Sequence, residues 1–308
     1  MHDERLVTRV AYQYYIQNLT QSQIAKNLNI GRSTISRLLT QARQQHIVSI
    51  NINTADAGLL ELEAQLKAQY HLRNVDLIDS THSDLDLALA KEAAQYLKQI
   101  IKPNNLVGLS WGASLALMVG QLDHPKAANA TFVPLVGGPS AANAKYHVNT
   151  IVYDLAKKFM GNSVFINATA VQESRYLRDG IMNAKYFQEL ARDWAHLDIA
   201  LVGIGGPLNH KTTSRWRDLL TPEDQAMLKE QRAIGDCCCT FYDANGKLLA
   251  PDLQKRTIAI SLDTLKRTPI RIAVARSKEK VPAIKALLKM GVVNTLITDN
   301  ETANQLLH

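Results

Sequence analysis

The sequence predicts an α/β protein of two domains, a small helix-turn-helix unit over residues 1–54 and a larger α/β domain over residues 55–308. Three observations lead to this prediction. The length of 308 residues exceeds that of one ordinary domain. More than half of the net charge of +7 lies in the first 50 residues, which hold six Arg or Lys against two acids. Beyond about residue 70, apolar runs alternate with amphipathic helical patterns.

The first domain is predicted from the stretch TQSQIAKNLNIGRSTISRLL, residues 20–39. Thr20 followed by Gln23 fits a capping box, so a helix can begin there. The letters NIG then break this helix, and Gly31 is able to take a positive φ if the tight turn needs one. A second helix is predicted over 32–45, and an earlier helix over about 4–18 completes a three-helix core. The inward positions are Ile35, Leu38, Leu39 and Ala42 in the second helix, and Leu6, Val10, Tyr14 and Ile16 or its neighbours in the earlier one.

The outward face of the second helix is polar and cationic. Such side chains reach phosphates and base edges in a major groove. A generic helical hairpin with a solvated face has the same spacing, but small Ala25, the turn at Gly31 and the Ser, Thr and Arg cluster favour DNA binding. The alternation in IVSININ, residues 47–53, predicts a strand beside the unit. The expected DNA-binding residues are Thr20, Gln21, Arg32, Ser33, Thr34, Ser36, Arg37 and Arg43.

The second domain opens with an amphipathic helix over 58–69, and we expect Leu59, Leu62 and Leu66 on it to contribute to a subunit contact. Regular alternation then predicts a mostly parallel sheet, and ligands on such sheets bind beyond the carboxyl ends of the strands. The predicted strands are 74–79, 105–110, 131–136, 163–167, 199–204, 237–242, 256–261, 271–275 and 292–297. The predicted helices between them are 86–101, 148–159, 185–197 and 280–290.

Glycine-rich segments follow three of these strands. In VGLSWGAS, residues 107–114, Gly108 and Gly112 let the backbone approach a ligand, and the N–H groups of Gly112, Ala113 and Ser114 open a helix. That arrangement can seat an anion without a cation, although a strand-to-helix turn without a ligand fits the spacing equally well. The other two segments are LVGGPS, 135–140, and VGIGGP, 202–207.

Two charged residues and three cysteines have both a functional and a structural interpretation. Asp236 begins an apolar run and could accept hydrogen bonds from sugar hydroxyls, or form a surface salt bridge. Lys280 begins a helix and could reach a phosphate, or be one solvated lysine among several. Cys237, Cys238 and Cys239 are consecutive, which suits neither a disulfide nor a C-x-x-C site; small buried side chains are the better interpretation. No metal, cofactor or catalytic residue is expected.

Hydropathy gives no reason to expect a membrane segment. No window holds 18 apolar residues, and the first 30 residues lack the core of a signal peptide. We therefore expect a cytoplasmic protein with no membrane partner.

Taken together, the motifs resemble those of the SorC family of sugar-responsive bacterial transcription regulators, a group related to DeoR-like effector domains. The resemblance covers essentially the whole chain. Within the family the chain looks most like the sorbose-operon regulators. The carrying segments are LTQSQIAKNLNIGRSTISRLL, GLSWG, VPLVGGPS, YHVNT, RDGIMNAKYF, DIALVGIGGP, IGDCC and VNTLITDNETANQLL.

This resemblance implies a winged helix-turn-helix joined to an effector domain of the phosphosugar isomerase/CoA-transferase fold. It also implies a homotetramer on operator DNA that regulates a sugar-utilisation operon. The effector would be a sugar or sugar phosphate, with sorbose phosphate favoured. The effector-binding positions implied by the resemblance are Ser110, Trp111, Gly112, Ala113, Ser114, Gly137, Gly138, Asp236 and Lys280.

The chain departs from its apparent relatives at two places. Val136 stands where some relatives have a lysine that forms a Schiff base, so covalent capture at that position is excluded. Arg276 and Ser277 stand where many relatives have a glycine pair.

The alternative function is a sugar-phosphate isomerase-like enzyme on the same fold, which would need a positioned acid/base pair. An enzyme of that kind has no use for a basic helix-turn-helix. A purely architectural DNA-binding protein would not need the α/β domain.

Overall fold

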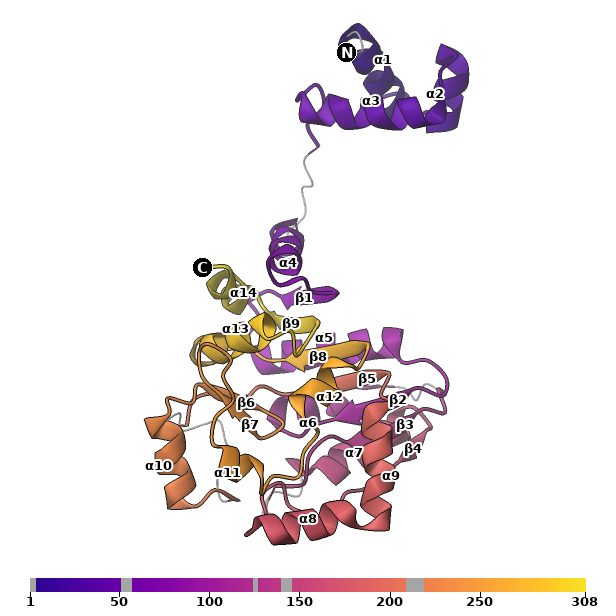
Figure 1. The fold of residues 1–308 in the computed structure, drawn as a ribbon. Helices are drawn as coiled ribbons and strands as arrows, with labels where there is room; N and C mark the ends of the chain where they lie inside the picture. Colours follow the sequence, from indigo (N-terminus) through magenta and orange to yellow (C-terminus); the bar gives the residue numbers. More distant parts are fainter. Residues whose placement is uncertain (1–3, 51–56, 124–126, 140–145, 209–218) are drawn as a thin grey trace. The chain divides into compact units, whose positions relative to one another are not determined.

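A computed structural model describes residues 4–50, 57–123, 127–139, 146–208 and 219–308 (Figure 1). Its contacts divide the chain into two compact units, Met1–Ala57 and Gly58–His308. Among the described residues, no helix is both long enough and apolar enough to cross a bilayer.

The first unit contains three helices, α1 (Glu4–Tyr15), α2 (Gln21–Leu28) and α3 (Arg32–Gln44). The capping box is confirmed, because the Gln23 N–H donates to Thr20 Oγ1 at 3.3 Å and the Thr20 N–H donates to Gln23 Oε1 at 2.9 Å. The four inward positions predicted on α3 are all buried. In α1, however, Ile16 is 65% exposed and Val7 is fully buried, because the helix ends before Ile16.

The turn between α2 and α3 differs from the prediction. Asn29 takes the left-handed conformation with φ of 51°, whereas Gly31 is extended with φ of −66° and serves as the N-cap of α3. Asparagine tolerates positive φ better than most residues, so a glycine is not required. Residues 47–50 form a bend and no strand; residues 51–53 of the predicted strand lie outside the described residues.

The second unit is built on a seven-stranded parallel sheet with the order β1-β9-β8-β5-β2-β3-β4. Parallel neighbours require crossover connections, which is why helices separate the strands in the sequence. The strands of this sheet are β1 (Asn74–Ile78), β2 (Leu106–Leu109), β3 (Thr131–Pro134), β4 (Asn162–Ser163), β5 (Ile199–Val202), β8 (Ile270–Val274) and β9 (Thr295–Asp299).

Helices pack along this sheet in the alternating pattern that the sequence predicts. Helices α5, α6 and α7 pack side by side, and α13 and α14 pack on each other beside β9 (Figure 1). The helices are α4 (Ala57–Tyr70), α5 (Leu85–Ile100), α6 (Ala113–Gly120), α7 (Val148–Lys158), α8 (Arg175–Asn183), α9 (Lys185–Ala195), α10 (Pro222–Glu230), α11 (Pro251–Gln254), α12 (Leu262–Lys266), η3 (Lys278–Lys280), α13 (Val281–Lys289) and α14 (Asn300–Leu307).

Three predicted strands are wrong in extent or kind. The run 237–242 lies in an antiparallel hairpin of β6 (Gly235–Cys237) and β7 (Thr240–Tyr242). The run 256–261 makes only isolated bridges, in which Thr257 pairs with Val171 and Ala259 with Val136. The run 163–167 contributes to the sheet only through Ser163, the last residue of β4. Apolar content marks burial in all three, but burial alone does not specify a regular strand.

The leucines of α4 pack inside their own domain. Leu66 is fully buried, and Leu59 and Leu62 pack against the same core. Leu66 therefore has no surface to offer a second subunit, whereas Leu59 and Leu62 are half-buried, and the subunit contact expected of this helix stays a prediction. Leu60, on another side of the helix, is 54% exposed.

Candidate functional site

The order in which the chain adds strands to the sheet reverses between β2 and β5, and a cavity opens at this point. From β2 the chain continues outward through β3 and β4, whereas β5 leads to β8 and β9 on the other side. Ligands on parallel sheets bind at such a switch point, beyond the carboxyl ends of the strands. The cavity has a volume of about 490 Å³. It brings together Ser110, Trp111, Gly112, Ala113, Ser114, Asp236 and Lys280.

The segment from Ser110 to Ser114 forms one wall of this cavity. Ser110 is 4% exposed, its backbone N–H donates to the Leu201 carbonyl at 2.9 Å, and its hydroxyl accepts from the Gly203 N–H at 3.0 Å. Gly112 is the N-cap of α6, with φ of 141°, and no side chain caps the helix there. A β-carbon built on Gly112 would meet no heavy atom within 4 Å, so this position faces open space. The first N–H groups of a helix lack intrahelical acceptors and attract anions.

Gly137 and Gly138 are not among the residues that line the cavity. The Trp111 indole N–H donates to the Gly137 carbonyl at 2.8 Å, so Gly137 positions a lining residue. A β-carbon on Gly137 would collide with the Thr169 backbone, and one on Gly138 would collide with the His147 ring. Close packing accounts for both glycines, and the effector contact expected of them stays a prediction.

Asp236 lies on β6 at the cavity wall and is 8% exposed. Its Oδ2 accepts the Cys239 N–H at 3.1 Å, and its Oδ1 lies against Gly205, where no β-carbon fits. The carboxylate is therefore held in one position by its surroundings. Of the two interpretations left open by the sequence, this burial excludes a solvated surface salt bridge.

Lys280 is half-buried at the start of α13. Burial lowers the pKa of its ammonium, while Asp236 and Asp86 act in the opposite direction. Lys280 is therefore part of a cluster of charges around the cavity and not an isolated solvated lysine.

The three cysteines form the hairpin turn beside Asp236. Cys238 and Cys239 have φ of 49° and 58°, so two non-glycine residues occupy a turn of the kind that joins two-residue hairpins. All three cysteines are buried and free, which confirms their interpretation as small buried side chains. Hydrogen bonding to Cys238 and burial raise the pKa of Cys237, and burial raises the pKa of Cys239. A thiol with a raised pKa is a poor nucleophile and metal ligand.

Several lining residues were missed by the sequence reasoning. The VGIGGP segment was noticed, and it supplies Gly203, Ile204 and Gly205. In the sequence, Arg276 and Ser277 stand out only as a departure from a family pattern. Asp86 had no signal, because it lies in the first turn of α5 and reaches the cavity only through the packing of that helix. The missed lining residues with polar groups include Asp86, Tyr146, Cys238, Cys239, Arg276, Ser277 and Glu279.

The expected DNA-binding residues lie in the first unit. Arg32, Ser33, Ser36, Arg37 and Arg43 are exposed on α3. Thr34 and Gln21 are half-buried, and Thr20 is exposed but engaged in the capping box. The structure thus places five of the eight on the solvent-facing side of α3.

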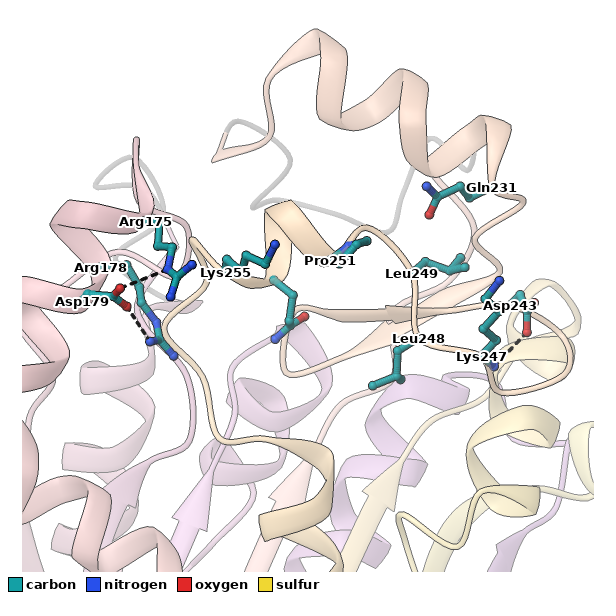
Figure 2. Close-up of a pocket in the computed structure, with 11 residues that line it drawn as sticks. Arg175, Arg178, Asp179, Gln231, Asp243, Lys247, Leu248, Leu249, Pro251 and Lys255 are labelled. Atoms are coloured by element: carbon teal, nitrogen blue, oxygen red, sulfur yellow. Dashed lines mark hydrogen bonds and ion pairs between the residues drawn. The ribbon is translucent and has the colours of Figure 1, made fainter.

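A second, larger cavity of about 820 Å³ lies among α8, α11 and the loop after β7 (Figure 2). Arg175 and Arg178 converge on Asp179, with N–O distances of 3.2 and 2.9 Å (Figure 2). Lys255 and Lys247 lie along the same groove. None of the predicted effector residues lines this cavity. Among the residues that the structure describes, no group of three or more His, Cys, Asp or Glu side chains could hold a metal ion.

Comparisons with known protein families match nearly the whole chain. Residues 56–308 match the family model described as "Putative sugar-binding domain", and residues 3–45 match the model of sigma-70 region 4. The chain is 34% identical to the sorbitol operon regulator of Klebsiella pneumoniae, over 99% of this chain and 98% of that protein. It is 30% identical to the transcriptional regulator LsrR of Escherichia coli strain K12, over 100% and 96%.

Solved structures give the same result. The full-length sorbitol operon regulator SorC from Klebsiella pneumoniae aligns with a TM-score of 0.77 at 33% identity and covers 100% of both chains. A transcriptional regulator from Streptococcus pneumoniae TIGR4 aligns with a TM-score of 0.77 at 41% identity, over 82% of this chain and 98% of that chain.

Proposed function

The chain belongs to the SorC family of sugar-binding transcriptional regulators, and we propose that it controls a sugar-utilisation operon in response to a sugar phosphate bound in the cavity at the β2–β5 switch point. The observation that carries this proposal is the start of α6. An N-cap glycine with no side-chain cap opens onto the cavity, directly beyond a buried strand. A helix start of this kind holds a phosphate through backbone N–H groups and the helix dipole.

The sugar moiety would face the opposite wall. The fixed Asp236 carboxylate can accept hydrogen bonds from hydroxyl groups, and Lys280 can supplement the phosphate seat with a point charge. Sorbose phosphate is the favoured effector by family resemblance, and the relationship to a sorbitol operon regulator supports a phosphorylated hexose or hexitol of this kind.

The DNA-binding function falls to α3 of the first unit, whose exposed face carries the arginines and serines that read operator DNA. A single small unit reads few base pairs, so the proposal includes a homotetramer on repeated half-sites in the cytoplasm. The protein acts as a binding protein and not as an isomerase-like enzyme, which an assay for sugar-phosphate isomerisation would test.

The effector site is tested by an operator-binding titration with sorbose phosphate and sorbitol phosphate. Gly112→Glu places bulk and negative charge at the seat and should abolish the response, while operator binding without effector persists. Ser114→Glu adds the same charge without occupying a positive-φ position, so it separates loss of binding from misfolding.

Gly120→Glu is the matched control, because a β-carbon there also meets no heavy atom within 4 Å but lies at the other end of α6. It should respond as wild type does. An unchanged response in both Gly112→Glu and Ser114→Glu would contradict the seat. So would a wild-type protein that responds equally to the unphosphorylated sugar.

A further inference from the structure

An arginine lies in the wall of the effector cavity, in the segment that follows β8. The Arg276 Nε donates to Asp86 Oδ1 at 2.8 Å, and its Nη1 lies 4.0 Å from Asp299 Oδ2. Arg276 and Asp86 line the same cavity as the start of α6. The cavity thus contains a guanidinium in addition to the backbone N–H groups of the phosphate seat.

The backbone holds this arginine in place through an unusual conformation at the next residue. Ser277 has φ of 105° and ψ of 147°, a region that is essentially restricted to glycine. Its N–H donates to Thr302 Oγ1 at 3.2 Å, and the Thr302 N–H in turn donates to Asp299 Oδ1 at 2.6 Å. A conformation of this kind persists where the surroundings determine it, and such positions cluster at ligand sites.

The two acids beside Arg276 differ in how firmly they are held. The side chain of Asp299 is 4% exposed and caps α14, whereas that of Asp86 is 70% exposed. Exposed ion pairs contribute little to stability, so Asp86 can be replaced as the partner of Arg276 at low cost. The Arg276 side chain is 24% exposed, and the buried Asp299 lies beside it as a second carboxylate.

We propose that the effector carries a second anionic group, which replaces Asp86 on Arg276 while the phosphate occupies the start of α6. This inference rests on the proposed function, because it takes the phosphate seat as given. It names the effector class as a phosphorylated sugar with an additional carboxylate or phosphate, in place of the sorbose monophosphate that family resemblance favours. Arg276 is then a specificity-determining residue.

The chemistry of the guanidinium favours an anion over a hydroxyl group at this position. Its planar fork of donors matches a carboxylate or phosphate in a bidentate manner, and such charge-assisted bonds are stronger than bonds to neutral oxygens. Lys280 lines the same cavity and is influenced by the Asp236 and Asp86 carboxylates. The proposed function assigns it to the phosphate seat, which leaves Arg276 for a second anion. When a ligand anion takes the place of the exposed Asp86 carboxylate, the positive charge of Arg276 stays balanced.

The test compares two ligands that differ only at carbon 1. Sorbitol 6-phosphate has a hydroxymethyl group there, and 6-phosphogluconate has a carboxylate on the same carbon skeleton. Calorimetry on the full chain should show that 6-phosphogluconate binds about tenfold more tightly, which is the effect of one charge-assisted bond. Arg276→Gln should abolish this preference, so that the ratio of the two affinities is about one. Asp86→Asn should increase the ratio, because it removes the carboxylate that competes for Arg276. Arg267→Gln, the same substitution at the exposed arginine that follows α12, should leave it unchanged.

Equal affinity of the wild type for the two ligands would overturn the inference. An equal loss of affinity for both ligands in Arg276→Gln would also overturn it, because the arginine would then act on the shared part of the ligand. Fructose 1,6-bisphosphate extends the test from a carboxylate to a second phosphate. The phosphate seat is tested separately by comparing sorbitol 6-phosphate with sorbitol. Equal binding of these two, or no binding of either phosphorylated ligand, overturns the proposed function together with the inference.

Discussion

The Ser110 hydroxyl accepts a hydrogen bond from the Gly203 N–H at 3.0 Å, and this bond joins the ends of β2 and β5. These two strands are neighbours in the sheet but are separated by more than 90 residues in the chain. The chain after β2 continues to β3 on one side, and the chain after β5 continues to β8 on the other side. Neither of these two connections covers the space beyond the bond. The cavity and the start of α6 lie here for that reason.

Gly205→Ala is expected to weaken the response to effector by about tenfold or more. A β-carbon at this position would collide with the Asp236 carboxylate, which has little freedom because Cys239 also holds it. Loss of a well-placed hydrogen bond to a charged group costs about 1.5–3 kcal/mol. Gly203→Ala is the matched control, because its β-carbon would make only an ordinary contact at 3.7 Å with the Trp111 carbonyl. Effector titration of both variants checks the prediction, and equal responses would contradict it.

Ser277→Gly is expected to stabilise the effector domain by about 1 kcal/mol. The serine occupies a glycine conformation whose strain is about 1–3 kcal/mol, and the greater entropy of glycine in the unfolded chain offsets part of the gain. Thermal unfolding should show a rise in Tm of about 2–4 °C. Gly291→Ala is the control, because it makes the opposite change at a glycine with φ of 65°. It should lower Tm. A lower Tm in Ser277→Gly would show that the serine side chain matters more than the backbone strain.

Glu92→Gln is expected to stabilise the protein at neutral pH and to have little effect near pH 4. Burial, together with Asp76 and Glu63, raises the pKa of Glu92 above its ordinary value of 4.5. The folded state therefore binds the proton more tightly than the unfolded state does. Stability falls as pH rises above the ordinary carboxyl pKa, and it stays lower once Glu92 is ionised. The glutamine removes this penalty only where the glutamate is charged.

Melting temperatures of the wild type and Glu92→Gln between pH 4 and pH 8 test this expectation. Glu61→Gln, the same substitution on the exposed side of α4, serves as the matched control. A gain in Glu92→Gln that is the same at all pH values would assign the effect to packing and not to charge.

Arg37→Ala is expected to weaken operator binding while the fold is unchanged. The residue is exposed on α3, next to the buried Leu38, and a base-reading arginine contributes about 1–3 kcal/mol of discrimination. Arg43→Ala, farther along the same helix, should weaken binding to all DNA sequences alike. It should also reduce the slope of log affinity against log salt concentration by about one. Fluorescence anisotropy with operator and unrelated DNA at several salt concentrations separates the two effects. Operator footprinting by a fragment that lacks the first unit would exclude this assignment.

Local patterns were sufficient to predict most elements of both units. The capping box at Thr20 and the inward face of α3 depend only on residues three and four apart, which a helix places together. The turn at Asn29 was assigned to Gly31, because sequence shows where a turn is needed but not which residue takes the positive φ. The hairpin at Cys238 and Cys239 was missed for a related reason, since two cysteines have none of the usual composition of such a turn.

The sequence by itself determined the order of strands and helices, the basic helix-turn-helix and the glycine-rich loop that opens α6. It determined them because each depends on contacts within a few residues. Tertiary structure alone decided which strand ends meet, that Asp86 from α5 faces Arg276 after β8, and that Gly137 and Gly138 support the cavity wall without lining it. These relationships join residues that can be more than a hundred positions apart, and their geometry is set by the packing of whole helices on the sheet.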